Sequence, residues 1–416
     1  MKQFIKKLIP PKVLGAYHYS LAMTGAILYG FPSRKLTVIA VTGTKGKSST
    51  VEIIHAILTA AGYNTAAAST IRFVIGEISE PNLFKMTMPG RFFLQQFLRK
   101  AVSRGATHAV IEMTSEGAKQ FRHKGIELDA LVFTNLSPEH IESHGSLENY
   151  IAAKLSLARH LEESKKRPRY MVANGDDKVG REFLKTKVEH VVPFTLSLAE
   201  PYSVDDKSVR FVWKKGTLFT VPLPGLFNLK NVLAALTLGE AMGIDLEVMH
   251  KALEHMHPIS GRAERVNRGQ PYSVVVDYAH TPDSLRALFE TYKSKRIIAV
   301  MGSTGGGRDK WKRPEMGRIA EEYCDTVILA NEDPYDEDPK SIVDEIAKGF
   351  SKMRPHVILD RRQAIREACR EAKEGDVVLI TGKGTDPFIM GPKGTKETWS
   401  DKKVAEEELK KLGYNN

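Results

Sequence analysis

The chain has 416 residues, of which 42% are hydrophobic and 27% charged, a composition that excludes a disordered, collagen-like or coiled-coil protein. The length predicts roughly two or three domains, and the two cysteines, Cys324 and Cys369, exclude a disulfide framework and favour a reducing compartment such as the cytoplasm. The formal net charge of +11 comes from scattered bases, which favours small anionic ligands, and we expect no nucleic-acid partner.

Residues 1–35 form a basic and mildly apolar leader. Four lysines precede an apolar stretch at 17–31, which contains the polar residues His18, Ser20 and Thr24. The stretch is too short and too polar to span a membrane, and it lacks the cleavage site of a signal peptide. The simpler prediction is a helix that packs on the next domain. The alternative is an amphipathic helix in weak contact with an anionic membrane, which would place the protein at the inner membrane face.

Strands and helices alternate in the first half of the chain, which predicts a mainly parallel sheet covered on both faces. A short hairpin follows at 209–221, around Lys-Lys-Gly, and then a helix that ends before Gly243. The predicted strands are 36–42, 108–113 and 131–134, and the predicted helices are 51–61, 92–103, 147–161 and 228–241.

A second alternation of strands and helices begins near Ser273 and predicts a Rossmann-like domain. We place the boundary between the two domains near 257–261. The predicted fold class is therefore α/β, with a leader at 1–35, a central α/β domain at 36–258 and a C-terminal Rossmann-like α/β domain at 259–416. The predicted strands of the last domain are 273–277, 297–301, 326–330, 357–359 and 377–381, and its helices begin near Asp283, Arg313, Pro339 and Arg362.

Residues 41–50, Val-Thr-Gly-Thr-Lys-Gly-Lys-Ser-Ser-Thr, join a predicted strand to a predicted helix. Backbone N–H groups of such a loop bind phosphate, and the glycines let the backbone approach it closely. The second lysine can reach the β- and γ-phosphates, and a serine hydroxyl can bind Mg²⁺. Val41 replaces the first glycine of the full Walker pattern. We predict a P-loop-type ATPase domain with ATP and Mg²⁺ as cofactors, bound through Gly43, Thr44, Gly46, Lys47, Ser48 and Ser49.

Glu112 and His140 each follow a predicted strand, at the edge of the sheet where the ligands of α/β proteins collect. A carboxylate and an imidazole beside a phosphate loop could bind a divalent ion. Each also has an ordinary explanation, Glu112 as a salt-bridge partner and His140 as a loop or capping residue.

Lys154 lies on the apolar face of the predicted helix 147–161, which it shares with Ile151 and Ala158. A lysine in this position usually extends its amine to water. If the amine is instead buried, its pKa falls and the neutral form can take up CO₂. The resulting carbamate would carry a negative charge and two oxygens for a metal ion.

Together these segments resemble the Mur ligase family, the ATP-dependent amino-acid ligases of peptidoglycan precursor synthesis. Residues 42–49 are similar to the family's phosphate loop T-G-T-N-G-K-T-T, which also lacks the first Walker glycine. Residues 133–145 and 150–154 are similar to its metal-histidine and carbamylated-lysine segments, and Glu112 to the metal ligand in E-V-S-S. The resemblance implies Ser48, Glu112, His140 and carbamylated Lys154 as metal ligands and Lys47, His140, Lys154 and Arg262 as catalytic residues.

The second half of the chain carries further segments of this kind. Residues 225–231, which include Asn228 and Asn231, resemble the stretch that meets adenine. Gly261-Arg262-Ala-Glu resembles G-R-x-E, whose arginine meets the γ-phosphate, and Asp277-Tyr-Ala-His280 resembles the nucleotide-facing D-Y-A-H. The segments that resemble the tripeptide-synthetase (MurE) branch are 305–314, 331–334 and 382–386.

Three features depart from the family pattern. The domain that grips the UDP part of the acceptor has no room in residues 1–35. The diaminopimelate motif D-N-P-R occurs as 332–335, Glu-Asp-Pro-Tyr, without the arginine that would pair with a second carboxylate, and acidic residues follow at 336–338. We therefore expect lysine or another basic amino acid as substrate. K-G-H-E occurs at 383–386 as Lys-Gly-Thr-Asp, and its last carboxylate could hold the incoming amine. The predicted substrate-binding residues are Asp333, Tyr335, Asp336, Gly384 and Asp386.

The resemblance implies that the protein joins an amino acid to the carboxylate of a muramoyl-peptide-like acceptor through an acyl phosphate, as a monomer. Two alternatives are also ligases: one that uses a lipid-linked or non-UDP acceptor, and a glutamate ligase similar to folylpolyglutamate synthetase. A nucleotide-dependent switch or nucleic-acid-binding NTPase would explain the phosphate loop but not Lys154. A binding module without turnover is the last alternative.

Overall fold

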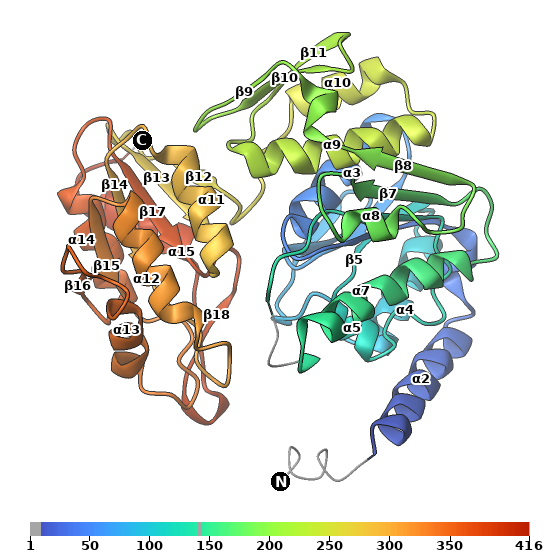
Figure 1. Ribbon diagram of the computed structural model, residues 1–416, viewed down its shortest axis with the longest axis horizontal. Coiled ribbons are helices and arrows are strands. Elements are labelled where there is room, and N and C mark those ends of the chain that lie inside the picture. The colour runs from blue at the N-terminus through green and yellow to red at the C-terminus, as the bar shows by residue number, and fades with distance from the viewer. Residues whose placement is uncertain (1–9, 140–143, 416) are drawn as a thin grey trace. The chain divides into compact units, whose positions relative to one another are not determined.

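The computed structural model describes residues 10–139 and 144–415 of the chain (Figure 1). The chain divides into two compact units. In contrast to the predicted linear division, two short segments before position 230 belong with the C-terminal part of the chain. Unit 1 comprises Met1–Pro201, Phe211–Phe219 and Lys230–Met256, and unit 2 comprises Tyr202–Arg210, Thr220–Leu229 and His257–Asn416.

Unit 1 contains an eight-stranded sheet in the order β4-β3-β2-β5-β1-β6-β7-β8. The six strands from β2 to β8 in this order are parallel, and β3 and β4 are added antiparallel at one edge. The central strands are apolar runs buried on both faces, as expected of a parallel sheet covered by helices. The strands are β1 (Thr37–Thr42), β2 (Thr65–Ala68), β3 (Arg72–Ile75), β4 (Ile78–Pro81), β5 (His108–Glu112), β6 (Ala130–Phe133), β7 (Tyr170–Asn174) and β8 (His190–Phe194).

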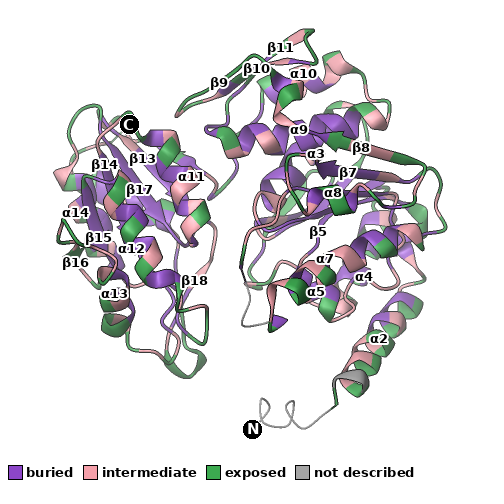
Figure 2. Cartoon of the chain, in the orientation of Figure 1, coloured by how far each residue is buried: buried purple, intermediate pink, exposed green. Residues whose placement is uncertain are grey.

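Four helices of unit 1, at 91–103, 115–119, 147–162 and 180–183, bury apolar residues in a core that they share with the sheet (Figure 2). The helix that carries Lys154 begins at the N-cap Ser146, whose side chain accepts a hydrogen bond from Asn149 N. The helices are α2 (Pro11–Leu28), α3 (Lys47–Ala60), α4 (Arg91–Ser103), α5 (Ser115–Lys119), α7 (Leu147–Glu162), α8 (Gly180–Phe183) and α10 (Leu246–Glu254), with the 3₁₀ helices η1 (Pro32–Lys35) and η2 (Leu196–Ala199).

A three-stranded sheet in the order β11-β10-β9 follows the large sheet in sequence. β10 (Val209–Trp213) and β11 (Thr217–Val221) form the predicted hairpin strands. The third strand, β9 (Tyr202–Val204), was not predicted, because its three residues are exposed and show no burial pattern. The helix α9 (Leu226–Ala241) comes next and continues from unit 2 into unit 1.

Unit 2 contains a six-stranded sheet in the order β12-β13-β17-β14-β15-β16, which is parallel except for β12. Alternate residues of its strands enter two separate apolar cores, one for each face of the sheet. Cys324 is buried in one core and Cys369 in the other, and burial raises the pKa of both thiols, that of Cys369 to about 12. The strands are β12 (Glu264–Val266), β13 (Ser273–Asp277), β14 (Ile297–Met301), β15 (Thr326–Leu329), β16 (His356–Val357) and β17 (Val377–Thr381).

The helices of unit 2 supply the rest of both cores. A buried ion pair joins the beginnings of two of them, since Arg361 Nη2 lies 2.7 Å from Asp401 Oδ2. The helices are α11 (Pro282–Tyr292), α12 (Lys312–Tyr323), α13 (Pro339–Ala347), α14 (Arg361–Glu371) and α15 (Asp401–Lys411), and a small hairpin of β18 (Phe388–Met390) and β19 (Lys396–Thr398) contains the 3₁₀ helix η3 (Pro392–Gly394).

The predicted fold class is confirmed, since two mainly parallel α/β sheets follow one another along the chain. The predicted strands 273–277, 297–301 and 377–381 coincide with β13, β14 and β17. Among the described residues, no helix is both long and apolar enough to cross a membrane.

Candidate active site

The phosphate loop joins β1 to the N-terminus of α3. Gly43 and Gly46 have φ angles of 147° and 79°, in the region that favours glycine. A Cβ on Gly43 would lie 2.0 Å from Thr134 Oγ1, and a Cβ on Gly46 would lie 2.1 Å from Asn231 Oδ1. Any larger residue would therefore displace the loop from its supports. A glycine-lined backbone turn at the N-terminus of a helix fits the triphosphate of ATP.

The loop is held by residues that follow the neighbouring strand β6. Thr44 N donates a hydrogen bond to Asn135 O at 2.8 Å, and Lys45 N donates to Asn135 Oδ1 at 2.9 Å. Thr134 Oγ1 donates to Lys45 O at 2.7 Å, and Thr44 Oγ1 lies 2.9 Å from Tyr150 OH on α7. No role was predicted for Thr134 and Asn135. The available signal was a polar pair directly after a buried strand.

Glu112 is buried at the end of β5, beside the phosphate loop. Its Oε2 accepts hydrogen bonds from Ser48 Oγ at 2.8 Å and from Thr70 N at 2.9 Å. Its Oε1 lies 3.9 Å from Lys47 Nζ, which donates to Thr44 O at 2.9 Å. The structure therefore brings the predicted residues Lys47, Ser48 and Glu112 together. Thr70, which was not predicted, orients the carboxylate.

Lys154 does not extend to water, because only 1% of the residue is exposed. Its Nζ donates to Gly43 O in the phosphate loop at 2.5 Å and lies 4.7 Å from the centroid of the Tyr150 ring. Burial, followed by the nearby charge of Lys47, holds the pKa of Lys154 well below the ordinary lysine value. The neutral amine that results is chemically competent to take up CO₂. The carbamate itself stays a prediction.

His140, predicted as a metal ligand and catalytic residue, lies outside the described residues. Within 10–139 and 144–415, no three His, Cys, Asp or Glu side chains gather into a ready metal site. Mg²⁺ prefers oxygen ligands, and a carbamate on Lys154 would add two of them to those of Ser48 and Glu112. The residues around the loop thus fit the predicted ion when the lysine is modified.

The two predicted adenine residues lie on α9, one in each unit. Asn231 Oδ1 accepts a hydrogen bond from Thr50 Oγ1 at 3.4 Å. Thr50 directly follows the buried Ser49 in the chain. Asn228 Nδ2 donates to Pro224 O at 2.8 Å. Asn231 therefore supports the helix that follows the phosphate loop, and a contact of either residue with adenine stays a prediction.

Two glycines bring distant segments of unit 2 together. A Cβ on Gly261 would lie 2.5 Å from Thr385 N, and a Cβ on Gly384 would lie 2.8 Å from Gly261 O. Their φ angles are 62° and 51°, again in the region that favours glycine. The segment that begins at Gly261-Arg262 was predicted to meet the γ-phosphate, and the loop 383–386 was predicted to bind the substrate. The two therefore pack directly on each other.

Arg262 and Asp277 lie beside this contact. The guanidinium carbon of Arg262 lies 4.5 Å from the centroid of the Tyr278 ring. Asp277 is buried, and its Oδ2 accepts a hydrogen bond from Ala263 N at 2.6 Å. His280 Nδ1 lies 2.7 Å from Tyr278 O. The carboxylate of Asp277 thus shapes the turn that carries the arginine.

A buried ion pair joins Asp333 to Lys383, which lie in two separate segments that were predicted to bind the substrate. Asp333 is 4% exposed, and its Oδ1 accepts hydrogen bonds from Lys383 Nζ at 2.9 Å and from Met390 N at 2.8 Å. Asp386 Oδ2 lies 3.3 Å from the same amine. Asp333 is thus engaged by the protein itself in this structure, and its predicted contact with the substrate stays a prediction.

The acidic residues at 336–338 are largely compensated within the protein. Glu337 Oε1 lies 2.7 Å from Nη1 of the buried Arg313, and Asp338 accepts hydrogen bonds from two backbone N–H groups at the start of α13. Asp336 is exposed, and Tyr335 is half-buried with a φ of 53°. The expectation that three free carboxylates attract a basic substrate therefore loses most of its basis.

Glu332 is a buried carboxyl group that was not predicted as a site residue. Thr304 Oγ1 donates to its Oε1 at 2.8 Å, whereas its Oε2 has no hydrogen-bond partner among the residues that the structure describes. Burial raises the pKa of Glu332. A Cβ on Gly382 would lie 2.2 Å from Oε2, so the glycine makes room for the carboxyl group. The only sequence signal that could have pointed to Glu332 was its position next to Asp333, a predicted site residue.

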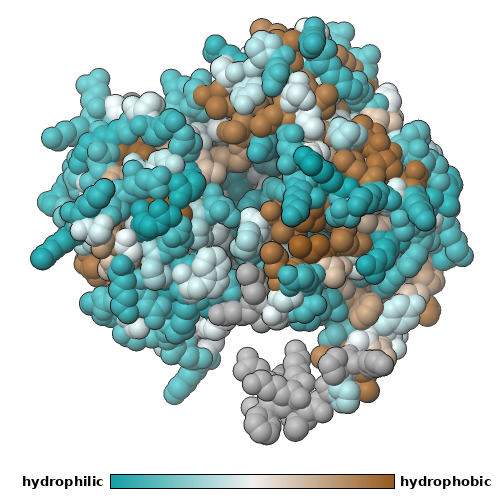
Figure 3. Space-filling view, viewed as in Figure 1, coloured by the Kyte–Doolittle hydropathy of each residue, from teal (hydrophilic) through white to brown (hydrophobic). Residues whose placement is uncertain are grey.

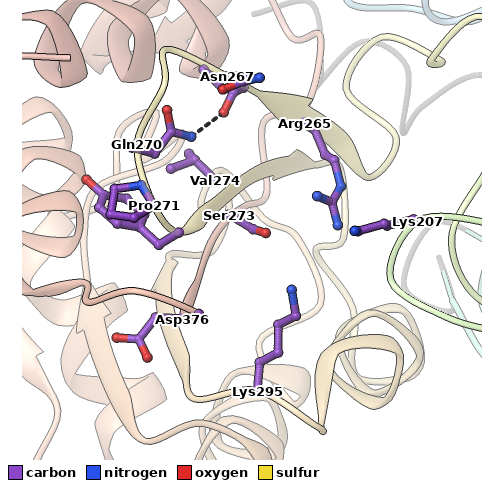
Figure 4. A pocket seen from close by; sticks show the side chains of 12 residues that line it. Lys207, Arg265, Asn267, Gln270, Pro271, Ser273, Val274, Lys295 and Asp376 are labelled. Atoms are coloured by element: carbon purple, nitrogen blue, oxygen red, sulfur yellow. Dashed lines mark hydrogen bonds between the residues drawn. The ribbon is translucent and has the colours of Figure 1, made fainter.

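A polar cavity of about 340 Å³ lies in unit 2 at the ends of the strands where β13 and β17 begin (Figure 4). None of the predicted site residues lines it. Arg265 and Lys295, which do, both pair with Asp206, at 2.6 and 2.7 Å. Their charges are therefore partly compensated, and we assign no reaction to this cavity.

Comparisons with known proteins identify the family to which the chain is similar. The Mur ligase middle domain matches residues 41–239, and the glutamate ligase domain of Mur ligases matches residues 261–384. A UDP-N-acetylmuramoyl-L-alanyl-D-glutamate--2,6-diaminopimelate ligase from Syntrophomonas wolfei subsp. wolfei is 36% identical over 405 residues, which cover 94% of this chain and 82% of that protein. A UDP-N-acetylmuramyl-tripeptide synthetase from Roseiflexus sp. is 36% identical over 423 residues, which cover 95% and 82%.

A solved structure has a similar fold. It is that of a UDP-N-acetylmuramoyl-L-alanyl-D-glutamate--2,6-diaminopimelate ligase, with a TM-score of 0.62 and 30% identity. The match covers 91% of this chain and 79% of that one. The chain therefore belongs to the Mur ligase family, whose members are ATP-dependent acid–amino-acid ligases.

Proposed function

We propose that this chain joins an amino acid to a carboxylate of a muramoyl-peptide-like acceptor, driven by ATP, in peptidoglycan precursor synthesis. The observation that supports this most directly is the buried amine of Lys154 in contact with Gly43 O of the phosphate loop. A nucleotide-dependent switch has no need of such a group. A carbamate formed there would supply metal-binding oxygens next to the reacting phosphate.

The proposed reaction has two steps. An oxygen of the acceptor carboxylate attacks the γ-phosphorus, the bond to the β-phosphate breaks, and ADP leaves an acyl phosphate on the acceptor. The amino acid's amine, after losing a proton, attacks the acyl carbon and releases inorganic phosphate. Lys47 and, by resemblance, Arg262 would offset charge on the transferred group. Ser48, Glu112, His140 and carbamylated Lys154 would hold Mg²⁺, which would neutralise phosphate charge when bound.

We propose lysine or another basic amino acid as the second substrate. Relatives of this chain include ligases named for 2,6-diaminopimelate, whose distal end carries both an ammonium and a carboxylate. Tyr335 occupies the place of the family arginine that would pair with that carboxylate. Asp386 keeps a carboxylate in the adjoining loop, with 11% of its side chain exposed. Because Asp386 also lies 3.3 Å from Lys383 Nζ, the proposal rests on the missing arginine: without a partner for a second carboxylate, an amino acid whose distal end carries an ammonium alone is favoured.

Mass spectrometry of reaction products tests both proposals. The full chain would be incubated with ATP, Mg²⁺ and a UDP-muramoyl dipeptide, a lipid-linked equivalent or a folate. Each acceptor would be combined with lysine, ornithine, diaminopimelate or glutamate. We expect a lysine or ornithine adduct of a muramoyl acceptor, and none with Lys47→Ala.

Other products would decide for the alternatives. Strict preference for diaminopimelate would contradict the proposed amino acid but not the ligase. A glutamyl folate would favour the glutamate ligase. ATP hydrolysis that ignores amino acids and responds to DNA or RNA would overturn the ligase proposal altogether.

We further propose that the reaction takes place in the cytoplasm, where ATP is available, and that the active form is a monomer. Light scattering coupled to size-exclusion chromatography tests the second statement. A stable dimer at micromolar concentration would contradict it.

A further inference from the structure

A chain of hydroxyl groups joins the segment 82–88 to the buried carboxylate of Glu112. Thr87 Oγ1 lies 2.7 Å from Thr70 Oγ1, which in turn donates a hydrogen bond to Glu112 Oε2 at 3.1 Å. Thr70 N donates to the same oxygen at 2.9 Å. Both threonines are half-buried, and neither was predicted as a site residue. Their contacts nevertheless end on the carboxylate that we predict to bind the metal ion.

The sheet of unit 1 brings Thr70 to this carboxylate. β2 and β5 are parallel neighbours, with Ala68 paired to Ile111. Thr70 and Glu112, which come at the ends of the two strands, therefore meet at the carboxyl edge of the sheet, where the ligands of α/β proteins collect. The backbone hydrogen bond of Thr70 follows from this strand pairing, whereas the second one depends on its side chain.

The segment 82–88 is fastened to the same turn. Asn82 is buried, and its Nδ2 donates hydrogen bonds to Ser69 O at 2.9 Å and to Met86 O at 3.0 Å. One amide group thus holds the residue before Thr70 and the residue before Thr87 together. The contact between the two threonine hydroxyls is therefore a built part of the fold.

The direction of each hydrogen bond follows from the groups that take part. A carboxylate only accepts, so the one hydroxyl proton of Thr70 points to Glu112, and Thr87 must donate its proton to Thr70 Oγ1. Ser48 Oγ also donates to Glu112 Oε2, at 2.8 Å. Oε2 therefore accepts three hydrogen bonds. Oε1 accepts none from the residues that the structure describes, and it lies 3.9 Å from Lys47 Nζ.

The exposed apolar side chains of the segment 82–88 do not identify a site by themselves. Leu83, Phe84 and Met86 are exposed, but Figure 3 shows hydrophobic residues at the surface of both units. Such residues are ordinary on folded proteins. A hydroxyl chain that ends on a buried carboxylate is the more specific feature of this segment.

We propose that Thr70 and Thr87 are positioning residues of the ligase reaction, which hold Oε2 of Glu112 by hydrogen bonds and leave Oε1 available to the divalent ion. Thr87 acts through Thr70, so the segment 82–88 contributes to the site without contacting the carboxylate. The inference rests on the proposed function, since it requires Glu112 to be a metal ligand. Hydrogen-bond partners of a ligating carboxylate fix its orientation, and their loss lowers metal affinity or activity by about 10–100-fold.

Calorimetric titration of the full chain with a non-hydrolysable ATP analogue, once with Mg²⁺ and once with EDTA, tests the proposal. The dissociation constant in EDTA divided by that in Mg²⁺ measures what the metal ion contributes to nucleotide binding. Thr70→Val removes the hydroxyl but keeps the shape, and we expect it to lower this ratio by about 10-fold or more. Thr87→Val should lower the ratio less, and Thr70→Ser, which keeps the hydroxyl, should restore it. In turnover, Thr70→Val should lower kcat and leave the KM for the amino acid unchanged.

Thr195→Val is the matched control and should show the wild-type ratio. Thr195 is also half-buried in unit 1, and its Oγ1 also lies 2.7 Å from another hydroxyl, that of Ser197.

The variant Glu112→Gln separates this inference from the proposed function. A wild-type ratio in Thr70→Val, together with a lowered ratio in Glu112→Gln, would overturn the inference alone. A wild-type ratio in Glu112→Gln would overturn the metal assignment as well. If Thr70→Val weakened nucleotide binding equally with and without Mg²⁺, the inference would also fall, because the loss would not involve the metal ion. Product analysis decides on the ligase itself, independently of these results.

Discussion

The most deeply buried described lysine of unit 1 and that of unit 2 have opposite surroundings. Lys154 in unit 1 and Lys383 in unit 2 are each 1% exposed. The Nζ of Lys154 donates to a backbone carbonyl of the phosphate loop, and burial lowers its pKa. The Nζ of Lys383 lies 2.9 Å from Asp333 Oδ1 and 3.3 Å from Asp386 Oδ2.

The difference shows that burial alone does not decide what a lysine does. A carbonyl oxygen accepts a hydrogen bond from a neutral amine but does not compensate the charge of an ammonium. Two carboxylates do compensate it, and the paired amine then holds the two loops together. The lysine of unit 1 is therefore suited to covalent chemistry, and the lysine of unit 2 to holding the substrate loop in shape.

The largest effect on stability is expected at Lys383. Lys383→Met leaves the buried carboxylate of Asp333 without its cation and should lower the free energy of unfolding by about 3–5 kcal/mol. Urea denaturation followed by circular dichroism measures the change. The double variant Lys383→Met/Asp333→Leu should recover much of the loss. A single variant as stable as the wild type would contradict the structural role.

The largest effect on activity is expected at Lys154. Lys154→Ala removes the amine that we propose to carry the carbamate and should lower ATP- and amino-acid-dependent phosphate release by about 10²–10³-fold. Lys154→Arg keeps a long cation that cannot be carbamylated at neutral pH and should be equally inactive. Intact-protein mass spectrometry should find bound CO₂ on the wild type only. Full activity of either variant would refute the assignment.

The stability of Lys154→Met should change in the opposite direction from that of Lys383→Met. The folded protein keeps the amine neutral at pH values at which the unfolded chain binds a proton. Between the lowered pKa and the ordinary value of 10.5, wild-type stability should therefore rise with pH, by at most about 1.4 kcal/mol per pH unit. The methionine variant should lack this slope and be the more stable one at neutral pH. Urea denaturation across that range in CO₂-free buffer measures it, and identical slopes would contradict the prediction.

The smallest effect is expected at Glu332, the carboxyl counterpart of Lys154 in unit 2. Because burial raises its pKa, the folded protein keeps a proton that the unfolded chain releases above the ordinary value of 4.5. Stability should therefore fall as the pH rises from 4.5 through the raised pKa, by at most about 1.4 kcal/mol per pH unit. Glu332→Gln should remove this fall. Thermal unfolding at several pH values tests it, and an unchanged pH profile would speak against it.

Features with a local signal could be predicted from the sequence. The phosphate loop is one, because glycines, lysine and serines are adjacent in the chain and the flanking strand and helix have clear patterns. The apolar strand β13 is another. β2 was not predicted, because its segment Thr-Ala-Ala-Ala favours a helix in isolation. It is a strand because it pairs with β5, whose paired residues lie 43 positions further along the chain.

Features that depend on distant partners could not be predicted in the same way. Glu337 and Asp333 counted as free negative charges in the sequence. Their partners Arg313 and Lys383 are 24 and 50 positions away, so no charge pattern along the chain reveals the pairing. The burial of Lys154 could be anticipated only as one of two outcomes, because helical spacing gives the face of a residue but not what covers it.

The two buried thiols of unit 2 have a practical consequence. Cys324 and Cys369 are covered by the cores and have raised pKa values, so both should react slowly with maleimides. One cysteine introduced on the surface of each unit could then carry a fluorophore while both native cysteines are kept. Energy transfer between the two dyes would report whether ATP changes the distance between them.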